Sequence, residues 1–287
     1  MSMPVGIDLA EGPEALGVLA LRGADAVRFL QGQVSADVEK LTPGSSTFAG
    51  LHNPQGRVVA LLAVVRTSPE EILATLPREL VDAVAVRLRK YVLRSKLRID
   101  DESAALRVLG VWGGHEERAF PTIAWGDRCV QLLPVEREFR RAPGVTRAQW
   151  DAADVRAGIP QVFAPTSESF IAQMLNLDLL GAIAFDKGCY TGQEVIARAH
   201  YRGRVKRRMQ RWHNGSGVGL KPGDPAHAGD GRALTVVRVG VRDSQGEEVL
   251  AVGNFAPGEM PTAVQGTEAA DGPRVTGPLP LPYALPE

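Results

Sequence analysis

The sequence predicts an α+β fold that ends in an all-β module, and three observations support this class. Strand-like apolar segments alternate with two amphipathic helical stripes between residues 16 and 112, a pattern typical of sheets with helices on one face. The pattern from Arg147 to Gly181 is helical again and is broken at Gly158-Ile159-Pro160. After Ala199, short strand-like segments are separated by Gly, Asp and Asn turns, which favours a small barrel or sandwich.

The first half of the chain supplies the elements of the predicted sheets in order. Leu16–Leu21 reads as a strand, and the next helix has apolar residues at spacings of three and four: Val27, Leu30, Val34, Val38 and Leu41. The turn residues His52–Arg57 lead into Val58–Val65, a continuous apolar run that predicts a strand covered on both faces. A strand at Glu71–Leu76, a helix from Arg78 to Tyr91, and strands at Lys96–Asp100 and Leu106–Trp112 follow.

The last third predicts strands at Arg204–Trp212, Ala233–Val241 and Glu248–Phe255. The end of the chain, Pro257–Glu287, is rich in proline, and we expect it to lie over its neighbours in extended form.

Composition excludes several classes of protein. The chain has 287 residues, 44% of them hydrophobic, and 33 Lys and Arg balance 33 Asp and Glu. A largely disordered chain would be less apolar, and a surface that binds nucleic acid or anionic membrane throughout would carry net positive charge. The length predicts two or three domains, and a local basic patch remains compatible with neutrality.

Cysteine usage and the N-terminal pattern indicate the cell compartment. Cys129 and Cys189 form no CxxC pair and no Cys/His cluster, so we expect neither a metal site nor a disulfide framework. The longest apolar stretch, Val58–Val65, is far shorter than the roughly 18 residues that span a bilayer. The first 21 residues lack the basic segment of a signal peptide. These observations predict a cytoplasmic protein with no membrane partner.

The segment Lys187-Gly188-Cys189-Tyr190-Thr191-Gly192-Gln193-Glu194 carries the strongest chemical pattern. Thr191 and Glu194 fit a capping box, which predicts a helix with Thr191 as its N-cap. Cys189 would then lie beside the positive end of a helix and near the Lys187 ammonium, and both favour a reactive thiolate or an anion site. The competing interpretation is a tight strand–turn–helix junction in which Cys189 is a small buried apolar residue.

A second feature is the basic stretch, which we define as Arg198, Arg202, Arg204, Lys206, Arg207, Arg208 and Arg211. With Tyr201 and Trp212 at its edges, it could hold a polyanion such as RNA or a polyglutamate tail. Equally, these cations could pair with the acidic C-terminal module and brace it.

The motif and its flanks resemble a known family. Residues 187–194, Ala197-Arg198, Arg202-Gly203, Ala157–Pro160, and Gly23-Ala24-Asp25 with Phe29–Gln33 are similar to the YgfZ folate-binding proteins. These are relatives of the glycine-cleavage T-protein, an aminomethyltransferase. The similarity extends from about residue 15 to residue 212.

The resemblance implies a T-protein-like ring of three subdomains around a channel for tetrahydrofolate. Residues 1–50 with 145–203 would form one α+β subdomain, residues 51–144 a second of ferredoxin-like type, and residues 204–287 a β-barrel with the proline-rich tail.

The resemblance also implies a role in maintaining iron–sulfur enzymes, including those that modify tRNA, so the expected partners are folate, these client enzymes and tRNA. Lys187 and Cys189 would be the catalytic residues, and the cofactor-binding residues would be Lys187, Tyr190, Gln193, Glu194 and Arg198.

The alternatives are a folate-dependent aminomethyltransferase and a tRNA-binding module that uses Arg198–Arg211. Whether the chain is an enzyme stays open; if it is, a one-carbon transferase is expected. Arg156, which replaces the acid that holds the pterin in T-proteins, and Cys189 both weaken the aminomethyltransferase alternative.

Overall fold

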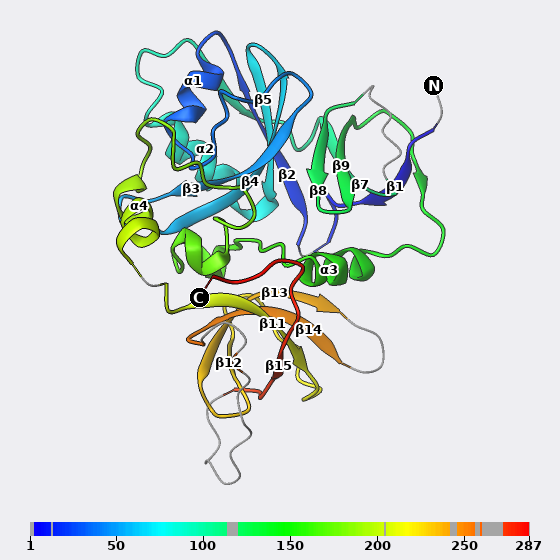
Figure 1. The fold of residues 1–287 in the computed structure, drawn as a ribbon. Helices are drawn as coiled ribbons and strands as arrows, with labels where there is room; N and C mark the ends of the chain where they lie inside the picture. Colours follow the sequence, from blue (N-terminus) through cyan, green and yellow to red (C-terminus); the bar gives the residue numbers. More distant parts are fainter. Residues whose placement is uncertain are drawn as a thin grey trace.

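The computed structural model describes residues 3–12, 14–113, 120–203, 205–241, 246–255, 259 and 272–286. Within this part, three five-stranded sheets carry most of the fold, and helices lie between and beside them (Figure 1). The α+β class predicted from the sequence is confirmed.

The first sheet has the strand order β3-β4-β5-β2-β6 and is antiparallel throughout. Its strands are β2 (Leu16–Arg22), β3 (Ser46–His52), β4 (Val58–Ser68), β5 (Glu71–Pro77) and β6 (Arg98–Asp101). The predicted strands at residues 16–21, 58–65, 71–76 and 96–100 are therefore confirmed, apart from shifts at their ends.

This sheet is buried on both faces, which explains the continuous apolar run in β4. Successive side chains of a strand point to opposite faces. On β2, Leu19 and Leu21 join the core under helices α1 (Ala26–Gln31) and α2 (Val81–Arg89), whereas Val18 and Ala20 join a core shared with the second sheet. The predicted helix from Arg78 to Tyr91 is confirmed as α2 preceded by a 3-10 turn, η1 (Arg78–Leu80).

The second sheet has the order β10-β1-β7-β9-β8. Its strands are β1 (Val5–Asp8), β7 (Leu106–Trp112), β8 (Thr122–Trp125), β9 (Arg128–Pro134) and β10 (Arg140–Arg141). The prediction for β7 matches residue for residue, and Cys129 is buried in β9, as expected of a strand residue. The predicted subdomain boundary after residue 50 falls inside β3, which pairs with β4. The division into subdomains stays a prediction.

The C-terminal strands form the third sheet, an open antiparallel half-barrel of order β12-β13-β14-β11-β15 (Figure 1). It contains β11 (Arg208–Asn214), β12 (Pro225–His227), β13 (Ala233–Val241), β14 (Glu247–Gly253) and β15 (Thr276–Leu279). The three strands predicted here are confirmed as β11, β13 and β14. An isolated bridge between His227 and Arg274 links the edge at β12 to the segment before β15, so the sheet curls toward closure.

Two predicted helices end earlier than expected. The stripe from Val27 to Leu41 is helical only as far as Gln31, and the backbone beyond it pairs with other segments: Val34 and Ser35 bond to β3, and the carbonyls of Val34 and Ala36 accept hydrogen bonds from Lys187. Helix α3 (Arg147–Arg156) is confirmed. The helical prediction beyond it is wrong: the chain forms only the 3-10 turns η2 (Ala164–Thr166) and η3 (Ala172–Leu175), followed by Asn176 in the left-handed region at φ 57.

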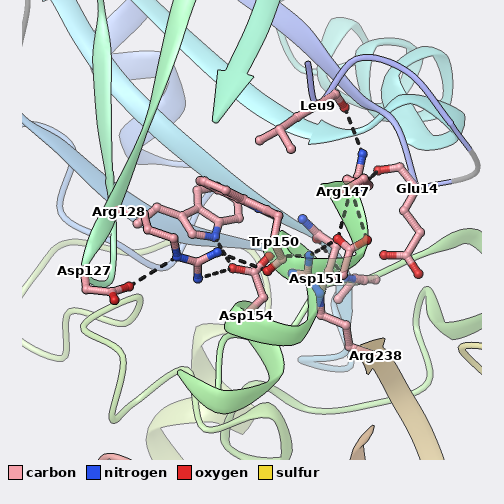
Figure 2. Close-up of polar contacts among 12 residues, drawn as sticks. Leu9, Glu14, Asp127, Arg128, Arg147, Trp150, Asp151, Asp154 and Arg238 are labelled. Atoms are coloured by element: carbon pink, nitrogen blue, oxygen red, sulfur yellow. Dashed lines mark hydrogen bonds and ion pairs between the residues drawn. The ribbon is translucent and has the colours of Figure 1, made fainter. Parts of the chain in front are cut away.

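A buried cluster of charges joins α3 to both neighbouring sheets (Figure 2). Asp154 on α3 accepts hydrogen bonds from Trp125 Nε1 at 2.7 Å and Arg128 Nη2 at 2.6 Å, and it also pairs with Arg238 of β13. One turn earlier, Asp151 pairs with Arg147 at 3.0 Å and with Arg238 at 3.4 Å. We call these residues the α3 charge cluster. It holds the half-barrel against the second sheet.

Candidate functional site

The Lys187 ammonium group is held by backbone oxygens, an arrangement that we call the Lys187 cage. Its Nζ donates hydrogen bonds to the carbonyls of Gln31 at 2.7 Å, Val34 at 2.8 Å and Ala36 at 2.7 Å. An ammonium group has three N–H donors, so these acceptors satisfy all of them. The same Nζ lies 5.1 Å from the centre of the Tyr190 ring. Lys187 therefore fixes the motif to the loop that follows α1.

Burial lowers the pKa of Lys187 to about 8, while the nearby carboxylates of Asp37 and Glu39 act in the opposite direction. At neutral pH the ammonium form still predominates. The cage thus keeps one positive charge beneath the motif.

Helix α4 (Gln193–Arg202) begins later than the sequence predicts. Its N-cap is Gly192 in the left-handed region at φ 82, without a side-chain capping hydrogen bond, so the prediction that Thr191 is the N-cap is wrong. The cause is close packing, because a Cβ on Gly192 would lie 2.6 Å from the carbonyl oxygen of Asn53. Only glycine lets the motif approach the turn at residues 52–57 this closely.

Cys189 is free and exposed, which contradicts the interpretation of it as a small buried residue. It precedes the first helical residue, Gln193, by four positions, farther than the capping-box prediction placed it. The exposed thiol is open to a reaction partner from solvent.

The other predicted site residues divide between interior and surface. Tyr190 is buried with its ring 6.2 Å from that of His52, and burial raises the pKa of Tyr190 to about 12. Gln193 is half-buried, whereas Glu194 and Arg198 are exposed on α4. The structure brings the predicted residues together along one loop and helix, but they line none of the pockets described next.

A pocket of about 650 Å³ lies between β3, the β8–β9 turn and α3, and we call it the Trp112 pocket. Its wall includes two aromatic residues, Trp112 and Phe48, one acid, Asp127, and one base, Arg156. Its volume is in the range of small-molecule sites. Such a wall can stack a planar ring, accept hydrogen bonds from ring N–H groups and pair with a carboxylate.

Sequence reasoning missed most of this pocket. Trp112 is partly buried and packs against the core that the first two sheets share, with its ring 4.8 Å from that of Trp150. Phe48 and Asp127 carried no chemical pattern; the only signal was the Gly126-Asp127 turn between two strands. Arg156 was singled out by the family resemblance, and its side chain is 56% exposed and lies 3.7 Å from Glu248.

The members of the basic stretch divide between ion pairs and the exposed surface. Arg208 is buried and forms a two-point ion pair with Asp178 at 3.0 and 2.8 Å, and Arg211 lies 3.9 Å from Glu248, so these two act as braces. Four members are exposed: Arg198, Arg202, Lys206 and Arg207. Arg204 lies outside the described residues.

The described residues include no helix long and apolar enough to cross a membrane.

Comparison with known proteins identifies relatives along most of the chain, although no model of a known protein family matches it. An uncharacterized protein of Haemophilus influenzae is 33% identical over 194 residues, which is 67% of this chain and 69% of that protein. The tRNA-modifying protein YgfZ of Enterobacter is 32% identical over 66% of this chain and 67% of its own length. YgfZ of Edwardsiella ictaluri is 34% identical over 68% of this chain and 67% of its own length.

Among solved structures, the aminomethyltransferase T of the glycine cleavage system from Bartonella henselae has a similar fold. The TM-score is 0.63 at 13% identity, and the match covers 88% of this chain and 79% of that protein. At this identity the likeness describes the fold alone.

Proposed function

Because the chain belongs to the family of the tRNA-modifying protein YgfZ, we propose that it supports tRNA modification while holding a reduced folate in the Trp112 pocket. The observation that carries the folate assignment is the composition of that pocket: two aromatic rings, one carboxylate and one guanidinium around about 650 Å³. A folate has a planar pterin, ring N–H donors and a glutamate carboxylate, and each of these finds a matching group in the wall.

In this proposal the residues of the pocket bind and orient the folate, which when bound supplies a one-carbon unit or reducing equivalents. Trp112 and Phe48 provide the surfaces for stacking, and Asp127 accepts hydrogen bonds from the pterin edge. Arg156 pairs with a carboxylate of the glutamate tail. Arg156 stands where an aminomethyltransferase would carry an acid, so we do not extend the proposal to aminomethyl transfer.

The motif residues have separate roles in the proposal. Cys189 is the exposed thiol that reacts with, or transiently binds, an iron–sulfur client enzyme. Lys187 is a positioning residue, because its three donors are used within the Lys187 cage. Tyr190 seals the cage, and Gln193, Glu194 and Arg198 form the adjoining surface on α4. The ring of three subdomains implied by the family resemblance belongs to this proposal as well.

Calorimetric titration with tetrahydrofolate tests the binding step. We expect binding by the wild type and a Kd about tenfold weaker for Arg156→Ala, since an ion pair that is partly buried on binding contributes on the order of 1.4 kcal/mol. Arg94→Ala removes an exposed arginine elsewhere and should leave the Kd unchanged. Absence of both heat and thermal stabilisation at saturating folate would refute the folate assignment.

The role in tRNA modification can be tested in cells that lack their own YgfZ-type protein, by measuring the amounts of modified nucleosides in their tRNA. The wild-type chain should restore modification, and Cys189→Ser should not, whereas Cys129→Ala should restore it because Cys129 is buried in β9. Equal restoration by both variants would exclude Cys189 from the function.

A further inference from the structure

A second pocket, of about 580 Å³, lies between α4, the start of β11, the end of β14 and the C-terminal tail. We call it the His200 pocket. Its wall includes Phe185 and His200, Gln173, Lys206, and Leu285 from the tail. None of these residues belongs to the Trp112 pocket.

The aromatic part of the wall is a stacked pair. The rings of Phe185 and His200 are 3.7 Å apart and inclined by 16°, and Tyr201 contacts the edges of both. His200 and Tyr201 are exposed. The pair therefore presents an aromatic surface on which another planar ring can stack.

The polar part of the wall contains an unused acceptor. Gln173 is 1% exposed, and its Nε2 donates to the carbonyl of Ile196 at 2.7 Å, which fixes the orientation of the amide. Its Oε1 is buried and has no hydrogen-bond partner within the described residues. A buried amide oxygen without a partner costs free energy, on the order of 1–3 kcal/mol, which a ligand N–H donor would recover.

The charge of the pocket is positive. The carboxylate of Asp178 is used in its two-point ion pair with Arg208. Lys206 is exposed and takes part in no ion pair that the described residues show. A ligand with an anionic group next to its planar ring would match Lys206 and the aromatic pair at once.

We propose that the His200 pocket binds a nucleotide, with its base stacked on the outer face of the His200 ring, an exocyclic amino group donating to Gln173 Oε1, and its phosphate against Lys206. The nucleotide is either part of an RNA chain or a free mononucleotide, which share this chemistry. Exposed Arg202 and Arg207 follow or precede lining residues in the sequence, next to Gly203 and Lys206, and suit the neighbouring phosphates of a chain. The RNA source rests on the proposed function, whereas mononucleotide binding does not.

Methyl NMR with adenosine monophosphate, adenosine and inorganic phosphate as probes tests the pocket directly. Adenosine monophosphate should shift the methyl signals of Leu179 and Leu285, which line the pocket, and leave the indole signal of Trp112 unchanged. His200→Ala should weaken this binding about 5- to 140-fold, the range expected for loss of one base–aromatic stack. Lys206→Gln should weaken binding of the nucleotide but not of adenosine.

Two exposed residues outside the pocket wall, Tyr91 and Lys90, provide matched controls, because replacement of an exposed side chain should preserve the fold. Tyr91→Ala removes an aromatic ring that is 49% exposed elsewhere, and Lys90→Gln removes an exposed cation. Neither should alter the affinity. Unchanged affinity in His200→Ala, or no shift of the Leu179 and Leu285 methyls with any probe or with RNA, would overturn the proposal.

A short single-stranded RNA separates the two sources. An RNA chain is identified if the RNA binds more tightly than the mononucleotide and if His200→Ala weakens that binding. Lys206→Gln should then reduce the slope of log affinity against log salt concentration by about one unit. Equal affinities for RNA and mononucleotide identify a free nucleotide. RNA that binds without shifting these methyls overturns the pocket but leaves the tRNA role intact, and the folate titration reports on the proposed function separately.

Discussion

The Lys187 cage and the α3 charge cluster both bury cations, but they neutralise them differently. The cage surrounds one ammonium with carbonyl oxygens from the end of α1 and the loop after it, and the carboxylates of Asp37 and Glu39 act only at longer range. The cluster pairs guanidinium groups of β9 and β13 directly with carboxylates of α3 (Figure 2).

The difference shows what each region does for the molecule. A ring of carbonyls orients a local loop and preserves one positive charge on a residue two positions before the exposed Cys189. The ion pairs of the cluster join segments that are distant in sequence. The cage is thus suited to shaping a site, and the cluster to holding sheets together.

Loss of the Asp154 carboxylate should lower the free energy of unfolding more than the other substitutions do. Asp154→Asn leaves Arg128 and Arg238 buried without their shared counter-charge, and such losses cost about 3–5 kcal/mol. Chemical denaturation would measure the free energy of unfolding. Asp127→Asn is the matched control, because Asp127 pairs with the same Arg128 but is 81% exposed, and it should cost less than about 1 kcal/mol. Equal losses of unfolding free energy in the two variants would show that the buried and exposed ion pairs of Arg128 contribute alike to stability.

Removal of the ammonium should have a smaller effect. Lys187→Met leaves the carbonyls of Gln31, Val34 and Ala36 without their donor but leaves no uncompensated charge, so we expect a loss of about 1–3 kcal/mol. Lys40→Met, at an exposed lysine that pairs with Asp37 and Asp186 in the same region, should cost under about 1 kcal/mol. A loss as large as that of Asp154→Asn would mean that the two regions stabilise the fold alike.

The pH dependence of stability contrasts these buried cations with His52, a buried base near the Lys187 cage that stays neutral. Burial lowers the pKa of His52 to about 3, so between pH 3 and 6.5 the unfolded chain binds the proton and the folded chain does not. Unfolding free energy should therefore fall as pH falls through this window, by up to about 1.4 kcal/mol per pH unit from His52. His52→Leu should lack this component. Parallel stability curves for the two proteins would contradict it.

The smallest effects distinguish the helices that adjoin the two regions. Thr146 caps α3 through a complete capping box, so Thr146→Ala should cost about 0.5–2 kcal/mol. Thr191 is not the cap of α4, so Thr191→Ala should change stability by less than about 0.5 kcal/mol. If α4 began at Thr191 in solution, thermal or chemical denaturation would show a loss of stability for Thr191→Ala similar to that for Thr146→Ala.

Local pattern predicted those elements whose partners do not alter the backbone. The apolar run of β4 and the bounds of β7 followed from periodicity and burial, and α2 followed from one apolar stripe. The stripe from Val27 to Leu41 had the same appearance, yet its helix ends at Gln31, and the backbone beyond it bonds to β3 and to a lysine more than 150 residues away. Periodicity contains no information about such a distant donor.

The candidate site divides in the same way. The motif at residues 187–194 could be found because its chemistry lies in consecutive residues. The Trp112 pocket could not, because Phe48, Trp112, Asp127 and Arg156 come from separate segments that only the folded sheets bring together. The N-cap at Gly192 was missed because the close approach of Asn53 decides it, and Thr191 with Glu194 imitates a capping box.

The final segment of the chain has a practical consequence. Tyr283 donates a hydrogen bond to the carbonyl of Gly158 at 2.8 Å, while Pro282 borders the Trp112 pocket and Leu285 and Pro286 border the His200 pocket. Removal of the last few residues by carboxypeptidase would take away part of the wall of both pockets. Ligands at either place should slow that digestion, which makes the rate of trimming a simple readout of occupancy.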